Sequence, residues 1–134
     1  MTRYLLDTNH LSGYLDRNSQ LEARVDAGLC GGDRFGISLP ILCEYRAGIA
    51  KGTRLKRNLA RLNAALEILR LWPADHQTAE EFGSLFQELR QAGRMLSQFD
   101  LLIAAMARQH ELILLTADAA FQETPRLRVE NWLA

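Results

Sequence analysis

The sequence has little of what marks the more specialised classes of protein. Among its 134 residues there are two cysteines and three prolines, aromatic residues make up 7%, and 16 basic residues balance 16 acidic ones. The longest uncharged apolar stretch, 101–107, is far shorter than the ~20 residues needed to span a bilayer. These shortages argue against a disulfide scaffold, a membrane protein and a basic polyanion-binding protein.

What remains is the composition of an ordinary globular protein, with 48% hydrophobic and 24% charged residues. The length predicts one domain over residues 1–134. The first residues reach an acid after a short apolar run, which is not the pattern of a secretory signal. Cys30 and Cys43 do not form a C-x-x-C pair, so we expect reduced, buried thiols in a cytoplasmic protein.

Short apolar runs alternate with helical patterns along the chain. We expect strands at 3–6, 35–38, 71–72, 112–116 and 128–132, with a polar loop at 7–9 after the first. Helices are expected from about Leu39, with Ser38 as its N-cap, and over 53–70, 76–92 and 99–110. This alternation predicts the α/β class, with a central, mostly parallel sheet of about five strands flanked by helices.

Four acidic residues lie where such a fold collects its ligands, beyond the carboxyl ends of the strands. Asp7 directly follows the first strand, and Asp118 follows the strand predicted at 112–116. Glu44 lies near the start of the helix after the second strand, and Asp100 opens the apolar helix. Each acid taken alone fits a cap, a turn residue or a solvated position.

Together, these acids predict a bound cation. Carboxylates held ~5 Å apart repel by roughly 3 kcal/mol per pair at an effective dielectric of about 20. A set made only of carboxylates favours Mg²⁺ or Mn²⁺ over Zn²⁺. His10, His76 and His110 show no metal-ligand spacing, so we interpret them as structural or surface residues.

The segments that hold the four acids resemble the four signature segments of the PIN-domain family, and most closely its VapC-type toxin members. These segments are Leu5–Ser12, Ile37–Glu44, Gly93–Ala105 and Leu115–Phe121. They come in the family's order and cover the chain from end to end. The resemblance implies a PIN-like domain that acts as a metal-dependent endoribonuclease, the toxin of a type II toxin-antitoxin system.

The resemblance also assigns roles to residues. It implies that Asp7, Glu44, Asp100 and Asp118 are the catalytic acids and the ligands of Mg²⁺ or Mn²⁺, with Asp118 the most variable position. Asp7 and Asp100 would be primary ligands, Asp118 a ligand directly or through water, and Glu44 a ligand or the base that orients the attacking water. The polar residues beside these acids resemble the family's supporting residues: Thr8, Asn9, Ser97 and Thr116.

A basic run between Glu44 and Glu67 contains no acid. A solvated helix face is the commoner reading of such a run, but its start beside a proposed metal ligand favours phosphate contact. Setting the four acids aside leaves an excess of four positive charges, so neutrality is the sum of two opposite patches. The candidate RNA-binding residues are Arg46, Lys51, Arg54, Lys56 and Arg57, with Arg94 near Asp100.

The family resemblance implies a protein partner as well as RNA. Relatives are held inactive by a cognate VapB-like antitoxin, and we expect a homodimer. The leucines of the helix predicted over 53–70 could face the core, a second copy or the antitoxin, and the core is the default for one helix face. They are Leu55, Leu59, Leu62, Leu66 and Leu69.

Two other functions stay open at this point. The first is a Rossmann-like phosphatase or phosphoryl-transfer domain with Asp7 as the nucleophile. The haloacid-dehalogenase pattern of that class needs a second Asp where this chain has Asn9. The second is a catalytically inactive PIN fold that acts as a binding module, which the presence of all four acids disfavours.

Overall fold

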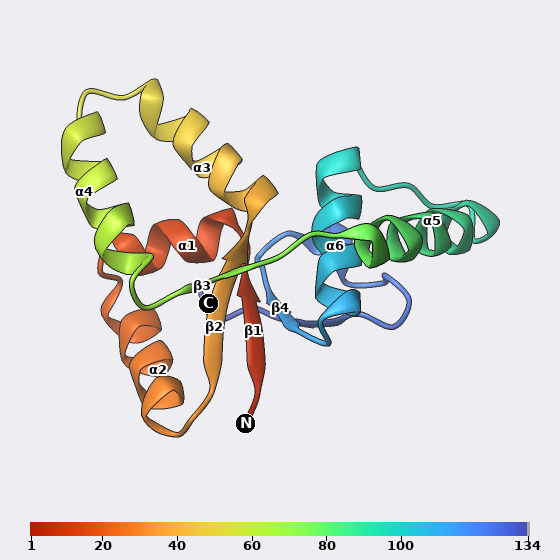
Figure 1. Ribbon diagram of the computed structural model, residues 1–134, viewed down its shortest axis with the longest axis horizontal. Helices are drawn as coiled ribbons and strands as arrows, with labels where there is room; N and C mark the ends of the chain where they lie inside the picture. Colours follow the sequence, from red (N-terminus) through yellow and green to blue (C-terminus); the bar gives the residue numbers. More distant parts are fainter. Residues whose placement is uncertain (134) are drawn as a thin grey trace.

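The computed structural model describes residues 1–133, apart from the side chain of Ser19 (Figure 1). The strands are β1 (Arg3–Leu6), β2 (Arg34–Ser38), β3 (Arg70–Trp72), β4 (Ile113–Leu115) and β5 (Arg128–Glu130). The helices are α1 (Thr8–Leu15), α2 (Ser19–Cys30), α3 (Leu39–Ala50), α4 (Leu55–Ala65), α5 (His76–Gln91) and α6 (Gln98–Gln109), with a short 3₁₀ helix η1 (Ala119–Phe121). The predicted α/β class with a five-stranded central sheet is confirmed.

The sheet has the strand order β3-β2-β1-β4-β5, and every neighbouring pair is parallel. The first strand in the sequence is therefore the central one. Its pairing with β4 brings Leu6 beside Leu115, and both side chains are fully buried. Continuous aliphatic strands of this kind are typical of a parallel sheet covered on both faces. All five carboxyl ends lie at one edge of the sheet.

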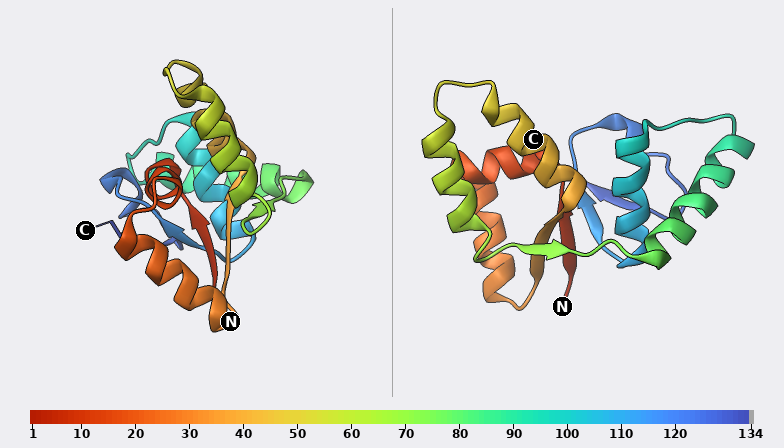
Figure 2. Two further views of the ribbon diagram at one scale, coloured as in Figure 1. Left: turned by 90° about the vertical axis from the view of Figure 1, so that its left-hand side faces the viewer. Right: turned by 45° about the horizontal axis from the view of Figure 1, so that its top comes forward.

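Helices close over that edge from two directions. In Figure 1 the hairpin of α3 and α4 stands on one side of the strands, and α5 and α6 stand together on the other. The right-hand view of Figure 2 shows the same division, and α3 also contacts α6. Helix α6 is deeply buried, since Ile103, Ala104 and Met106 have no exposed surface.

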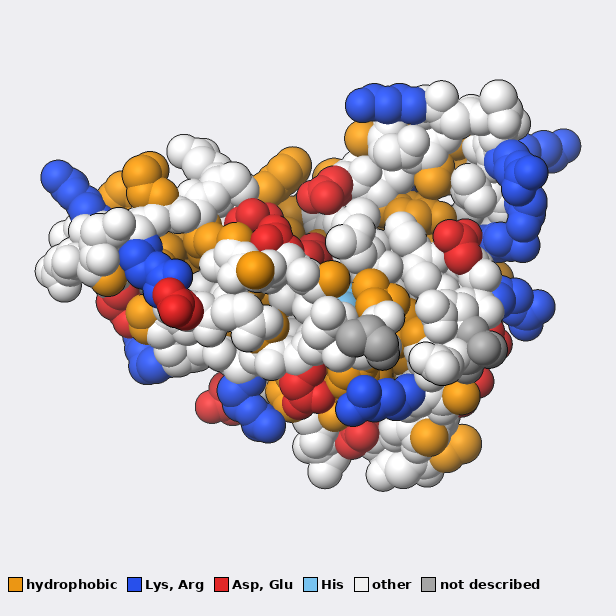
Figure 3. Space-filling model, turned by 180° about the vertical axis from the view of Figure 1, so that it is seen from behind, with side chains coloured by type: hydrophobic (Ala, Val, Ile, Leu, Met, Phe, Trp, Pro, Cys, Tyr) orange, Lys and Arg blue, Asp and Glu red, His pale blue; other side chains and the backbone are white. Residues whose placement is uncertain are grey.

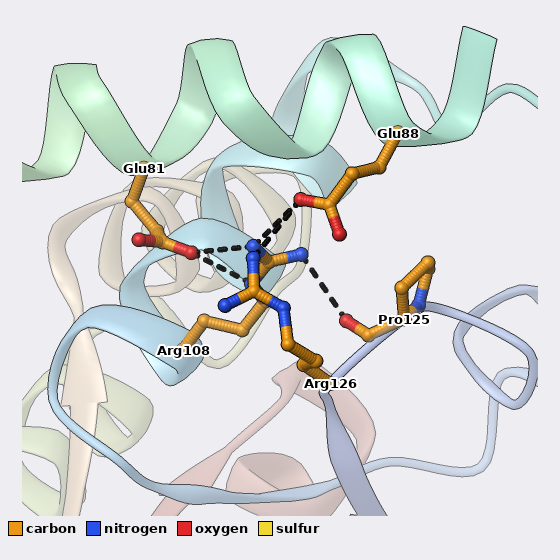
Figure 4. A network of polar contacts seen from close by, with 5 residues as sticks. All are labelled: Glu81, Glu88, Arg108, Pro125 and Arg126. Carbon is orange, nitrogen blue, oxygen red and sulfur yellow. Dashed lines mark hydrogen bonds and ion pairs between the residues drawn. The ribbon is translucent and has the colours of Figure 1, made fainter. Parts of the chain in front are cut away.

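An ion network fixes α5 against α6 at a distance from that edge (Figure 4). The Arg108 side chain is 3% exposed and donates to Glu81 at 2.7 Å and to Glu88 at 2.8 Å. It also donates to the backbone carbonyl of Pro125 at 3.1 Å. Arg126 reaches Glu88 at 3.1 Å. Two acids and two arginines thus satisfy one another where α5, α6 and the segment before β5 meet.

Three local predictions are wrong. The polar loop expected at 7–9 is the start of α1, because Asp7 serves as the N-cap of a helix that begins at Thr8. The helix expected over 53–70 covers only Leu55–Ala65, and the chain then turns into β3. The thiols of Cys30 and Cys43 are free but exposed rather than buried. Helix α2 had not been predicted.

The leucines of the predicted 53–70 helix divide between core and surface. Leu62 and Leu69 are buried, Leu59 and Leu66 are half-buried, and Leu55 is exposed. The core is therefore their main use, as expected for one face of a helix. None of the described helices is both long enough and apolar enough to cross a membrane.

His10 has a structural place. Its side chain is fully buried, and its Nε2 accepts a hydrogen bond from the backbone N–H of Trp132 at 3.0 Å. Burial lowers the pKa of this imidazole to about 4. A neutral ring is what an acceptor for that N–H requires, so His10 ties the end of the chain to α1.

Candidate active site

The four predicted acids arrive at the carboxyl edge from four separate segments. Asp7 follows β1, Glu44 lies on the second turn of α3, Asp100 lies in the first turn of α6, and Asp118 precedes η1. The strand order places β1 beside both β2 and β4, so the segments after these strands must meet. The negative charges of Asp7, Glu44 and Asp118 all act on Asp100, which shows that the four acids share one region.

Asp7 is held by contacts to both of its carboxylate oxygens. Oδ1 accepts the backbone N–H of Thr8 at 2.9 Å, and Oδ2 accepts the hydroxyl of Thr116 at 2.7 Å. The backbone N–H of Asp7 continues the pairing with β4 by donating to the carbonyl of Leu115 at 2.9 Å. Thr116 is fully buried, so this threonine fixes the carboxylate rather than serving solvent.

Two of the predicted supporting residues connect Asp7 to other acids. The Thr8 hydroxyl donates to Glu44 Oε1 at 3.1 Å, which links α1 to α3. The Thr116 hydroxyl also accepts the backbone N–H of Asp118 at 3.0 Å. Asp118 Oδ1 in turn accepts the N–H of Ala120 at 2.9 Å and caps η1. A chain of hydrogen bonds thus runs from Glu44 through Thr8, Asp7 and Thr116 to Asp118.

Asp100 is placed by its own helix. Ser97 is the N-cap of α6, and its hydroxyl accepts the backbone N–H of Asp100 at 3.2 Å. Burial raises the pKa of the Asp100 carboxyl, a side-chain hydrogen bond with Ser97 opposes this, and the three other acids raise it further. Asn9 is exposed, and across residues 1–133 its side chain makes no hydrogen bond.

No basic side chain neutralises these acids. Among the ion pairs of residues 1–133, none involves Asp7, Glu44, Asp100 or Asp118. In the same residues, no three Asp, Glu, His or Cys side chains are close enough to hold one metal ion as they stand. Oxygen donors that have no basic side chain as a partner fit Mg²⁺, because this ion keeps several of its waters and needs only one or two carboxylates.

Most of the predicted RNA-binding residues lie on the α3–α4 hairpin. All five of them there are exposed, and none forms an ion pair within the described chain: Arg46, Lys51, Arg54, Lys56 and Arg57. Figure 3 shows acidic side chains gathered in a hollow and Lys and Arg side chains along the outer edge of the molecule. Arg94 lies elsewhere, paired with Glu123 at 2.6 Å.

The fold and this edge define a class: an α/β domain with a parallel sheet and an acidic site beyond its carboxyl ends. Residues 4–127 match the PIN domain family. The chain belongs to the PIN domain family, which confirms the resemblance seen in the sequence.

Relatives of this chain are similar to it over nearly their whole length. It is 30% identical over 134 residues to "Ribonuclease VapC2" of Haemophilus influenzae, covering 99% of this chain and 100% of that protein. It is 30% identical over 133 residues to "tRNA(fMet)-specific endonuclease VapC" of Shigella flexneri, covering 98% and 99% of the two chains. The predicted similarity to VapC-type toxins is therefore confirmed as well.

A solved structure shows the same fold in an assembly. The structure of VapBC2 from Rickettsia felis, bound to a DNA fragment from its promoter, has a chain that matches this one with a TM-score of 0.88 and 26% identity. The match covers 98% of this chain and 99% of that chain. The arrangement of sheet and helices is thus shared from β1 to β5.

Proposed function

We propose that the chain is a divalent-metal-dependent endoribonuclease and acts as the toxin of a toxin-antitoxin pair. The observation that carries this proposal is the convergence of four acids without a basic partner at the carboxyl edge of a PIN domain. The ribonuclease and toxin roles are supported by relatives that carry those names over their full length. The metal requirement is supported by the donor set, which consists of oxygen ligands alone.

In this function the acids bind and orient. When bound, Mg²⁺ or Mn²⁺ lowers the pKa of a coordinated water and neutralises charge on the phosphodiester. Asp7 and Asp100 serve as ligands, and Asp118 is a ligand directly or through water. Glu44, held by Thr8, is a further ligand or orients the water that attacks phosphorus. Burial and repulsion raise the pKa of Asp100, which a nearby cation would counteract.

The RNA is held by the basic residues of the α3–α4 hairpin. Their charges are free to contact phosphates, which supplies affinity without base specificity. Few aromatic side chains are available for stacking, so recognition of a folded RNA by its shape suits this surface. A relative is named as specific for tRNA(fMet), which makes that tRNA the first substrate to test.

The partners follow from the same class. A cognate VapB-like antitoxin is supported by the VapBC assembly that shares this fold. A homodimer is supported by exposed apolar side chains near the start of α6, with Met95 88% and Phe99 51% exposed. An RNA substrate and an antitoxin partner suit a cytoplasmic protein, and light scattering of the purified chain tests the dimer.

One experiment separates this function from its alternatives. The purified chain is incubated with tRNA(fMet), with another structured RNA and with a small phosphate ester, first in EDTA and then with added Mg²⁺ or Mn²⁺. We expect RNA cleavage only with metal, leaving 5′-phosphate and 3′-hydroxyl ends. Equal cleavage in EDTA would refute the metal requirement, and turnover of the ester alone would favour a phosphatase.

The toxin role needs a test in cells. Induced expression of the chain is expected to arrest growth, and co-expression of a VapB-like antitoxin is expected to relieve the arrest. The Asp7→Asn variant is the matched control, because it retains the fold and the partner surface. Growth arrest by this variant would show that toxicity does not come from cleavage.

A further inference from the structure

The hydroxyl of Ser38 is an exception to the pairing of buried polar groups. Within residues 1–133, two buried side-chain polar atoms have no hydrogen-bond partner, His10 Nδ1 and Ser38 Oγ. His10 is otherwise used, since its Nε2 accepts the N–H of Trp132. Ser38 is fully buried and its single polar side-chain atom has no partner. A buried hydroxyl without a hydrogen-bond partner lowers the stability of the fold, so its presence needs a reason.

Helix capping does not provide that reason. Ser38 occupies the N-cap position of α3, where a serine ordinarily accepts an N–H from the first turn. Here its side chain makes no cap hydrogen bond. Pro40 lies at the second helical position and has no N–H to donate. The residue has the position of a cap without performing the function of one.

Its place in the sheet is more informative. The parallel register between β1 and β2 pairs Tyr4 with Phe35 and Leu5 with Gly36. Two residues further along, the same register brings Asp7 beside Ser38, and both have extended backbones. Side chains at matched positions of neighbouring parallel strands point to the same face of a sheet.

Asp7 has a matching neighbour on its other side. The register between β1 and β4 pairs Leu6 with Leu115, so the next pair is Asp7 with Thr116. The hydroxyl of Thr116 does donate to Asp7 Oδ2, at 2.7 Å, as the shared face requires. Ser38, Asp7 and Thr116 therefore form a row across β2, β1 and β4, with the carboxylate between two hydroxyl groups.

We propose that Ser38 is a positioning residue for Asp7. Its hydroxyl donates to the Asp7 carboxylate from the β2 side when the site is loaded with metal and RNA, as Thr116 does from the β4 side. Ser38 Oγ is closed to solvent, so it acts through Asp7 and does not touch the RNA. This role rests on the proposed metal-dependent cleavage, because it assigns the hydroxyl to the loaded site.

The test is a single substitution that is expected to raise stability and to lower activity. Ser38→Ala removes an unpaired polar atom, so the melting temperature of the protein in EDTA is expected to rise by about 4 °C. The same change is expected to lower kcat for RNA cleavage about tenfold, and to weaken Mn²⁺ binding in calorimetry about tenfold, as loss of a group that orients a metal ligand does. KM for RNA stays at the wild-type value, because the RNA surface is untouched.

Two further variants act as controls. Ser38→Thr keeps the hydroxyl in an extended backbone that accepts a branched side chain, and it is expected to restore cleavage and Mn²⁺ binding. Thr78→Ala removes a buried hydroxyl from the capping box of α5, far from the acids. It is expected to lower the melting temperature and to leave cleavage unchanged, which shows that lost stability alone does not reduce activity.

Two results would overturn the proposal. A lower melting temperature for Ser38→Ala would mean that the hydroxyl has a structural partner in the resting protein. A higher melting temperature with unchanged cleavage and Mn²⁺ binding would mean that the hydroxyl has no role in the site. Failure of the proposed function looks different, because the wild-type protein itself would then neither bind Mn²⁺ nor need it for cleavage.

Discussion

Two groups of acidic side chains in this fold are arranged in opposite ways. Glu81 and Glu88 of α5 face Arg108 and Arg126, and each acid pairs with a cation of the same chain. The acids at the carboxyl edge of the sheet have hydroxyl and backbone N–H partners but no cation within the described residues. The negative charges of the first group are balanced by arginines of the same chain, and those of the second group are not.

The pKa shifts show the same contrast. Hydrogen bonding to Arg108 lowers the pKa of Glu88, so its charged form stabilises the fold. Burial and the three other acids raise the pKa of Asp100, so its charged form opposes the fold. Acids that stabilise a fold are satisfied within it, whereas acids kept at a cost to stability mark a candidate functional site. Three sets of variants test this distinction, and a fourth tests the basic surface beside the second group.

The largest effect is expected for Asp7→Asn. Loss of this carboxylate removes the proposed metal ligand that Thr8 and Thr116 both hold, and RNA cleavage is expected to fall by at least about 100-fold. Circular dichroism is expected to show a folded protein. Glu81→Gln is the matched control, because it removes a carboxylate from the Arg108 network and should leave cleavage at the wild-type rate. Equal losses of cleavage in both variants would show that the two groups of acids do not differ in function.

Arg108→Met is expected to have the largest effect on stability. It leaves Glu81 and Glu88 without their main partner, and breaking a buried pair costs about 3–5 kcal/mol. Both glutamates are about 30% exposed, so we expect a smaller loss of about 2–3 kcal/mol in the free energy of unfolding. Urea denaturation measures it. Adding Glu81→Gln and Glu88→Gln should recover part of the loss, and no recovery would contradict the ion network.

The variants Asp100→Asn and Glu88→Gln are expected to change the melting temperature in opposite directions. At neutral pH and in EDTA, Asp100→Asn should raise the melting temperature, because it removes a charge that burial and three acids oppose. Glu88→Gln should lower it, because it removes a charge that Arg108 stabilises. Melting curves over a pH series check both effects.

The pH dependence of these two variants follows from the shifts. The contribution of Glu88 is present above its unfolded pKa and is lost as the pH falls through its lowered pKa. In EDTA, the cost of charged Asp100 is relieved as the pH falls through its raised pKa. The two variants should therefore approach the wild-type stability in acid. Shifts of equal sign at neutral pH would show that the two groups of acids do not differ.

The smallest effect is expected on the basic surface. Arg57→Ala removes one of several exposed charges on the α3–α4 hairpin and should weaken RNA binding a few-fold, with the salt slope reduced by about 1. Arg34→Ala is the matched control, an exposed arginine at the start of β2 and thus at the opposite edge of the sheet. Binding is measured in the Asp7→Asn background at several salt concentrations. Equal effects would place the RNA elsewhere.

The sequence predicted the sheet and the placement of the acids at its carboxyl edge for the same physical reason. Short aliphatic runs such as 113–115 are buried on both faces, and the acids that follow them come to one edge because the strands are parallel. The prediction of Asp7 and Asp118 as neighbours needed only this rule. The hydrogen bond from Thr116 to Asp7 follows from the same register.

What the sequence did not reveal depends on context. Asp7 followed by polar residues reads equally as a turn or as a helix cap, and only the packing of α1 decides between them. Leu66 and Leu69 continue the helical spacing after Ala65, although the chain turns there to reach β3. Helix α2 carried a signal that was missed, since Leu21 and Val25 lie one helical turn apart and are both buried.

The central place of β1 has a consequence for the order of synthesis. Strand β1 can pair with β4 only after β4 has been synthesised, and Asp7 meets Thr116 across 109 residues of sequence. Contacts so distant in sequence form after the intervening chain is available. The acids therefore cannot assemble while the nascent chain still holds residues 113–118 inside the ribosome. The acidic site therefore depends on the folding of the whole sheet, because no single segment of the chain brings Asp7 and Asp118 together.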